Sequence, residues 1–151
     1  MQQIARLFAH LEWANQRVLD LFKQLPEIPD RPKILFGHLL IAERLWMLRL
    51  RHGDASGTDV WPDYSLAELD QLAHANHAAY RMFVENIDEH GGLDEPVSYE
   101  TLEGEARESR IRDILLHVAL HGAYHRGQIA AALRGEDLDP VDTDFLTFSL
   151  E

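Results

Sequence analysis

The spacing of apolar residues along the chain predicts four long helices. The first stripe recurs every three or four residues from Ile4 to Leu25, as in an amphipathic helix, and Pro26 ends it. A second stripe predicts a helix with Pro32 in its first turn that runs to about His52. Two more predict helices over residues 66–90 and 109–134. Four such helices joined by loops of unequal length favour an all-α fold, a four-helix bundle.

Local signals indicate where these helices begin and end. Ser65-Leu66-Ala67-Glu68 has the S-x-x-E layout of a capping box and predicts the start of the third helix. Gly53 follows the second helix, as is typical of a helix end. For the fourth helix we expect Ser109 to act as the N-terminal cap and Gly135 to follow the last turn.

The remaining segments predict loops and one small irregular element. Residues 53–64 are rich in Gly, Asp and Ser and predict a loop. The alternation around Val97 to Tyr99, with Gly104 beyond it, predicts a small hairpin or extended excursion before the last long helix. The tail from residue 136 is acidic, but we expect its apolar residues to pack on the bundle: Phe145, Leu146, Phe148 and Leu150.

Length and charge limit the classes of function. A chain of 151 residues suits one domain, residues 1–151. Its 14 basic and 26 acidic residues give a net charge of -12, which disfavours nucleic acid and anionic membranes as partners. No apolar stretch approaches the roughly 18 to 20 residues that span a bilayer, and the start MQQIARLF lacks the layout of a signal peptide. We therefore expect a cytoplasmic protein.

The chain has nine histidines and no cysteine, which restricts its chemistry. The lack of cysteine excludes disulfides, thiolate metal sites, iron–sulfur clusters and cysteine nucleophiles. Imidazole and carboxylate remain as the strong metal ligands. The sequence contains no H-E-x-x-H, no phosphate-binding glycine loop and no G-x-S-x-G nucleophile motif.

Three histidines recur along one side of the fourth predicted helix. His117, His121 and His125 stand at i, i+4 and i+8. Imidazoles on neighbouring turns lie about 5–6 Å apart at Cβ and can share one ion. All three cannot share it, because eight residues rise about 12 Å. The spacing leaves two candidate pairs, 117/121 and 121/125.

A third ligand is expected from another helix. His38 lies on the apolar face of the second helix, and His77, on the third, is the competitor. One histidine on an apolar face is more often a hydrogen-bonded core residue. Three on one helix favour a bound cation, because unpaired buried imidazoles are costly. The other histidines have ordinary explanations at helix flanks, in last turns or off the apolar stripe: His10, His52, His74 and His90. The acidic runs 100–108 and 137–144 are expected to be solvated surface.

Three segments resemble the DinB family of damage-inducible proteins, part of the DinB/YfiT-like superfamily of candidate metalloenzymes. The most specific is HxxxHxxYHRGQI over residues 117–129. Residues 12–17, EWANQR, resemble the family's WAN segment. Residues 37–46 resemble its second-helix histidine, which an acidic or polar residue and a tryptophan follow. The resemblance covers essentially the whole chain.

The resemblance implies a four-helix bundle, usually a homodimer, with a divalent ion such as zinc or nickel bound by three histidines. By position these are His38, His121 and His125. His117 is then a neighbour on the same face and His77 a structural residue. Glu43 lies about 140° around the helix from His38, which argues against a direct role. No catalytic residue is assigned.

Two main hypotheses follow. The first is a metal-dependent hydrolase or thiol S-transferase acting on a small molecule. Relatives in the superfamily resemble transferases and isomerases that use low-molecular-weight thiols such as bacillithiol or mycothiol. Because the chain has no cysteine, any thiol must come from such a cofactor. The alternative is a non-enzymatic, stress-induced dimeric module with a structural metal site. A third, a DNA-binding stress protein, is disfavoured by the net charge.

Overall fold

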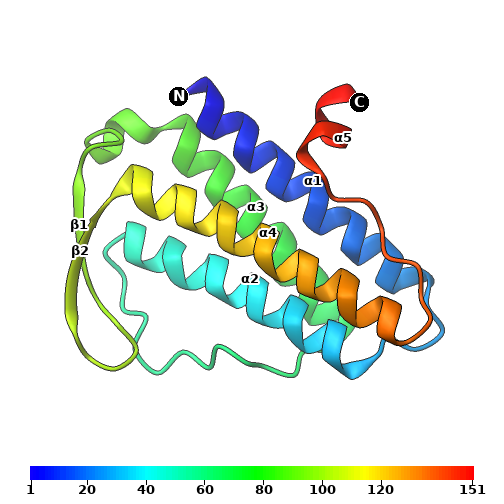
Figure 1. The fold of residues 1–151 in the computed structure, drawn as a ribbon. Coiled ribbons are helices and arrows are strands. Elements are labelled where there is room, and N and C mark those ends of the chain that lie inside the picture. The colour runs from blue at the N-terminus through cyan, green and yellow to red at the C-terminus, as the bar shows by residue number, and fades with distance from the viewer.

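The computed structural model describes residues 1–151, and most of them are helical (Figure 1). The long helices are α1 (Gln2–Gln24), α2 (Asp30–Leu50), α3 (Leu66–Glu85) and α4 (Ile111–Gly135). A short 3-10 helix, η1 (Ile87–His90), follows α3, and α5 (Phe145–Leu150) ends the chain. Strands β1 (Pro96–Glu100) and β2 (Ala106–Arg110) pair antiparallel before α4. The predicted helical bundle and the excursion before its last long helix are confirmed.

The capping box at the start of α3 is present, but the predicted cap of α4 is wrong. The Ser65 side chain accepts a hydrogen bond from the Glu68 backbone N–H, and the Glu68 carboxylate accepts one from the Ser65 backbone. Ser109 instead lies in β2, opposite Val97, and its hydroxyl pairs with that of Tyr99 at 3.2 Å.

Backbone carbonyls replace the missing side-chain cap of α4. The N–H of Ile111 donates to the carbonyl of Glu95, and the N–H of Arg112 donates to that of Leu93, both at 3.0 Å. The chain just before β1 thus satisfies donors that a helix start leaves free. The strand therefore runs directly into the helix.

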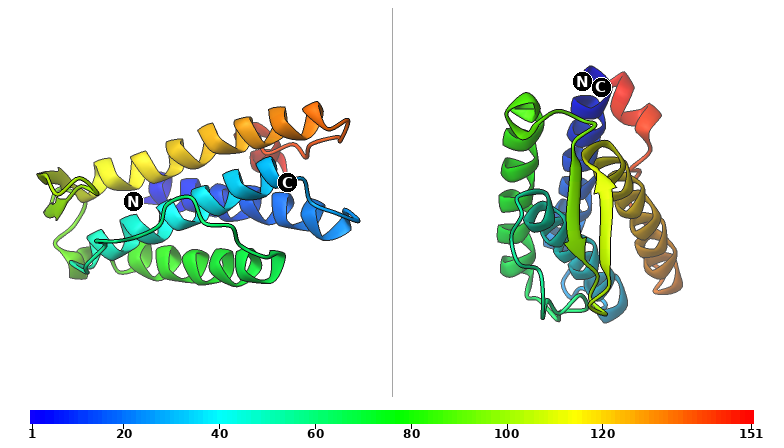
Figure 2. Two further views of the ribbon diagram at one scale, coloured as in Figure 1. Left: turned by 90° about the horizontal axis from the view of Figure 1, so that it is seen from below. Right: turned by 90° about the vertical axis from the view of Figure 1, so that its left-hand side faces the viewer.

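The helix directions place a long loop beside α2. In Figure 1, α1 and α4 run one way along the bundle and α2 and α3 the other, as the colours show. Residues 51–65 must therefore return along the bundle before α3 begins (Figure 2). α2 packs on α3 and α4, and α1 packs on the same two helices.

The hydrophobic core has two parts with polar side chains between them. One part gathers near the hairpin, around Leu11, Tyr80 and Leu115. The other gathers near the α1–α2 turn, around Phe22 and Phe36. The buried polar layer between them, as the name is used below, takes side chains from all four long helices: Asn15, Glu43, Asn76, His77 and Arg126.

The C-terminal tail packs on α1 through part of its apolar surface. The rings of Phe145 and Phe148 lie against His10, whose Nε2 contacts the carbonyl of Thr143 at 2.8 Å. Leu146 and Leu150 stay largely exposed. The expected packing is confirmed for the two phenylalanines only. None of the helices has the length and apolar character needed to cross a membrane.

Candidate metal centre

Three imidazoles meet between α2 and α4. His38, His121 and His125 each offer one ring nitrogen, and these nitrogens lie within 4.8 Å of one another. The Nε2 atoms of His121 and His125 are 3.0 Å apart. Two nitrogens bound to one ion at 2.0–2.1 Å would lie about 2.9 to 3.4 Å apart. The α4 pair therefore already has a separation that suits a shared ion, and His38 completes the set from α2.

Hydrogen bonds outside the cluster orient two of the rings. His38 Nδ1 donates to the carbonyl of Val60 at 2.6 Å, and His125 Nδ1 donates to the Gln128 side-chain oxygen at 2.7 Å. The Gln128 amide in turn donates to the Tyr124 hydroxyl. With its proton held at Nδ1, each ring presents the Nε2 lone pair to the cluster. This arrangement is typical of metal-binding histidines.

The third ring is free to change tautomer. Because His125 Nε2 has its lone pair, the contact with His121 requires a proton on His121 Nε2. No hydrogen bond engages His121 Nδ1. The proton can therefore move to Nδ1 and leave Nε2 for a ligand role.

The loop of residues 51–65, called the returning loop below, covers one side of the histidine cluster. Trp61 stacks on His38 with ring centroids 3.8 Å apart and an interplanar angle of 10°. A glycine beside His38 permits this approach, because a Cβ at Gly37 would lie only 3.2 Å from the carbonyl oxygen of Pro62. Trp61 itself is 53% exposed. The site thus has an aromatic wall that solvent reaches.

Burial keeps the α4 ligand candidates neutral at pH 7. Burial, followed by the neighbouring histidines, lowers the pKa of His121 to about 4. Burial also lowers the pKa of His125. The cluster contains no carboxylate. Neutral imidazoles with converging lone pairs form a site for a cation.

The structure brings only one of the two pairs that spacing left open close to His38. The pair that joins His38 is 121/125. His117 lies outside the cluster, with its ring 5.5 Å from that of His121 and edge-on to Trp46 at 5.1 Å. His77, the competitor for the third position, lies in the buried polar layer instead.

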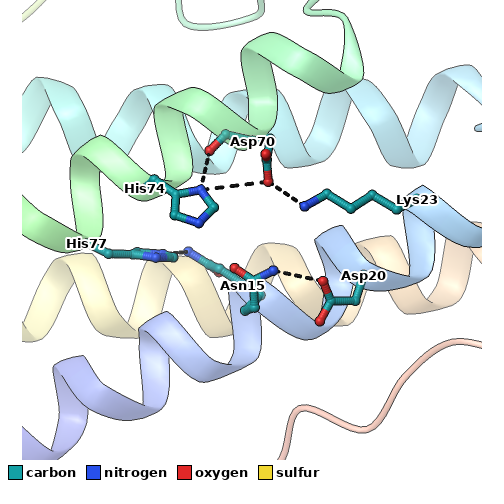
Figure 3. A network of polar contacts seen from close by, with 7 residues as sticks. Asn15, Asp20, Lys23, Asp70, His74 and His77 are labelled. Carbon is teal, nitrogen blue, oxygen red and sulfur yellow. Dashed lines mark hydrogen bonds and ion pairs between the residues drawn. The ribbon is translucent and has the colours of Figure 1, made fainter.

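His77 faces α1 rather than the metal centre. Its Nε2 contacts the Asn15 side-chain nitrogen at 3.5 Å, a contact drawn as a dashed line in Figure 3. Burial lowers its pKa to about 4. Nearby, Lys23 on α1 pairs with Asp70 on α3, whose backbone carbonyl contacts the exposed ring of His74 (Figure 3). The reading of His77 and His74 as structural residues agrees with these contacts.

Glu43 and Arg126 belong to one network that the apolar periodicity of the chain does not reveal. The two Glu43 carboxylate oxygens accept hydrogen bonds from Asn15 at 2.9 Å and Asn76 at 3.1 Å. Arg126 Nη1 donates to the Asn15 side-chain oxygen at 2.9 Å. Burial raises the pKa of Glu43 to about 7. The only available signal was a charged residue within each apolar stripe.

The lack of a side chain at Gly122 leaves space for the Arg126 guanidinium. A Cβ at Gly122, one turn earlier on α4, would lie 3.0 Å from Arg126 Nη1. The guanidinium therefore turns into the bundle directly after His125 turns toward the metal centre.

Comparison with known proteins agrees with this geometry. The model of the DinB family matches residues 33–149, which include all three histidines of the cluster. The chain belongs to the DinB family. Protein DinB of Bacillus subtilis (strain 168) is 22% identical over 161 aligned residues, which cover 93% of this chain and 90% of that protein. The resemblance drawn from the HRGQ, WAN and second-helix segments is confirmed.

Proposed function

We propose that this DinB-family protein, one domain built as a four-helix bundle, binds a divalent metal ion. The ligands are the Nε2 atoms of His38, His121 and His125. One observation carries the proposal: three imidazole nitrogens converge within 4.8 Å with no carboxylate among them. The Val60 carbonyl and the Gln128 side chain support it, because each fixes a ring from outside the cluster.

We further propose a metal-dependent reaction on a small molecule, either hydrolysis or thiol S-transfer. Three histidines suit zinc or nickel and leave coordination positions open. An ion held there would polarise a substrate carbonyl or lower the pKa of a bound water or thiol. A thiol would be a low-molecular-weight cofactor, since the chain has no cysteine.

Two aromatic side chains of the protein lie beside the proposed ion site. Trp61 covers His38, and the Tyr124 ring stands edge-on to His125 with centroids 5.2 Å apart. Both side chains are more than half exposed. They offer flat apolar surfaces on which a substrate can be positioned beside the open coordination sites.

A homodimer is proposed from the outer side of α4. Leu116, Leu120 and Tyr124 recur every four residues there, and Leu120 is 69% exposed. A continuous apolar strip on an exposed helix is typical of an interface. Light scattering of the purified protein should give twice the mass of the chain, and Leu120→Glu should give the monomer mass. A monomer in the wild type would contradict this part of the proposal.

Metal analysis tests the site itself. Wild-type protein loaded with zinc or nickel and desalted should retain about one ion per chain, and His121→Ala should retain almost none. The matched control is His74→Ala, which removes an exposed histidine on α3. Equal retention in wild type and His121→Ala would contradict the ligand assignment.

The metal-loaded protein is also assayed with ester, amide and thiol-transfer probes. A lack of turnover with all of them would support the alternative, a non-enzymatic metal-binding module. A cytoplasmic location and the lack of nucleic-acid binding stay predictions.

A further inference from the structure

Arg49, near the end of α2, is a buried cation without an acidic partner. Its side chain belongs to a residue that is 7% exposed, and no ion pair of the chain involves it. Its guanidinium carbon lies over the rings of Trp46 and Tyr99, at 4.6 and 4.8 Å from their centroids. Its one hydrogen bond runs from Nη2 to the backbone carbonyl of Glu100 at 2.8 Å.

This environment leaves the guanidinium poorly satisfied. An arginine carries five N–H donors, and here the Nε donor is enclosed and has no partner. Burial lowers the pKa of Arg49, and the electrostatic interactions with Tyr99 and Glu103 oppose this shift only in part. A buried charge is costly unless it is paired and hydrogen-bonded. The contacts with two aromatic rings reduce this cost without supplying a counter-ion.

A polar cavity of about 310 Å³ lies against Arg49. Its walls are the start of the returning loop, residues 52–57, and the hairpin residues 98–102 and 104, which meet at one end of the bundle (Figures 1 and 2). Arg49 lines this cavity, and its Nη1 makes no hydrogen bond and is not among the enclosed atoms. The guanidinium therefore has a free donor to offer a ligand there.

We propose that this cavity binds the oxyanion of a small molecule, a carboxylate or a phosphate, with Arg49 as its counter-ion. A guanidinium matches the geometry of both groups and forms charge-assisted hydrogen bonds with them. The hydroxyl residues Ser98 and Thr101 line the same cavity and add neutral donors. Asp54 and Glu100 also line it, but both are exposed, so water screens their charge more than that of Arg49. The remaining repulsion from these two carboxylates disfavours anions of high charge.

The cavity lies at the C-terminal end of α2, apart from the metal centre. Arg49 follows His38 by 11 residues, about 16 Å along a helix. The rings of Trp46 and His117 lie between the two sites. Anion binding here requires no metal, so the outcome is independent of the proposed function.

Nuclear magnetic resonance on the full chain can test the site. Sodium acetate and inorganic phosphate are titrated separately at pH 7, with sodium chloride keeping the ionic strength constant. We expect saturable shifts of the Arg49 Nε–H signal and of the amides of residues 53–57 and 98–102 with at least one anion. The anion that saturates identifies carboxylate or phosphate as the ligand group.

Variants separate binding from packing. Arg49→Gln should abolish the saturable shifts, and Arg49→Lys, which keeps the charge and stem, should weaken binding about tenfold, because the planar fork is lost. The matched control is Arg51→Gln, an exposed arginine two residues later, which should leave the affinity unchanged. Shifts that stay linear in the wild type with both anions, or that persist in Arg49→Gln, would overturn the proposal. If Arg49→Gln fails to fold, the wild-type titration and Arg49→Lys still decide it.

Discussion

The metal centre and the buried polar layer lie next to each other but are built on opposite principles. Both take residues from α2 and α4, and on α4 they are consecutive, His125 and Arg126. In the polar layer both oxygens of Glu43 are engaged, and Asn15 links them to Arg126. In the metal centre three imidazole nitrogens converge within 4.8 Å of one another, with no carboxylate in the cluster.

This difference indicates that the polar-layer residues hold the helices together, whereas the three histidines are arranged to bind a ligand. In the polar layer Asn15 joins the hydrogen-bonded Glu43 carboxylate to Arg126, although Nε of Arg126 has no partner, and removing one of the two charged residues leaves the other buried. His125 is buried and the other two imidazoles are half-buried, and their converging nitrogens can be shared by a bound cation. We therefore expect substitutions in the two regions to act on different quantities, the free energy of unfolding and the metal affinity.

The largest effect is expected from Glu43→Leu. At pH 8, above the Glu43 pKa of about 7, this change leaves the Arg126 charge buried and uncompensated and should lower the free energy of unfolding by about 3–5 kcal/mol. Urea unfolding of metal-free protein measures it. Adding Arg126→Met should recover a large part of the loss, whereas His121→Ala should change the metal-free stability little. Equal losses for Glu43→Leu and His121→Ala would erase the contrast between the regions.

His77→Leu should change how stability depends on pH. In the folded protein the pKa of His77 is lowered from 6.5 to about 4, so the unfolded chain binds the proton first as pH falls. This opposes folding increasingly from pH 6.5 down to about 4, by up to about 3 kcal/mol. The raised pKa of Glu43 acts with the opposite sign between pH 4.5 and about 7.

Metal-free wild type and His77→Leu are compared by urea unfolding at pH 7 and at pH 4.5. The variant should lose less stability on acidification. Parallel pH curves for the two proteins would show that His77 does not titrate as its burial implies.

A smaller effect is expected when the support of a ligand is removed. Gln128→Ala deletes the acceptor that holds the His125 Nδ1 proton and should weaken zinc affinity about 10- to 100-fold, with little change in stability. Isothermal titration calorimetry measures the affinity. The control is Gln16→Ala, which removes a half-buried glutamine that bonds only to Asp20 on its own helix. A loss of affinity no greater than in the control would mean that the Gln128 contact does not orient the ligand.

Much of the fold could be predicted because it rests on short-range pattern. Apolar stripes gave the long helices, and the capping box gave the start of α3. Spacing gave the two possible pairs on α4, and the resemblance to the DinB family selected His121 and His125 with His38. Gln128 could have been proposed as a support, since it stands three residues after His125 on the same helix.

The rest depends on contacts between distant segments. Ser109 looked like a cap because its pairing with β1 is not visible in its own neighbourhood. The contact of Val60 and Trp61 with His38 follows from the parallel course of α2 and α3, which local periodicity does not specify. The partnership of Glu43 and Arg126 likewise requires a third helix, which supplies Asn15.

X-ray absorption at the zinc edge tests the central claim most directly. Zinc-loaded wild type should show three imidazole nitrogens at about 2.0–2.1 Å, together with oxygen ligands such as water in the open coordination positions and no sulfur. His38→Ala should reduce the imidazole count to two. A zinc environment dominated by carboxylate oxygen, or one that His38→Ala leaves unchanged, would contradict the claim that α2 and α4 together form the metal centre.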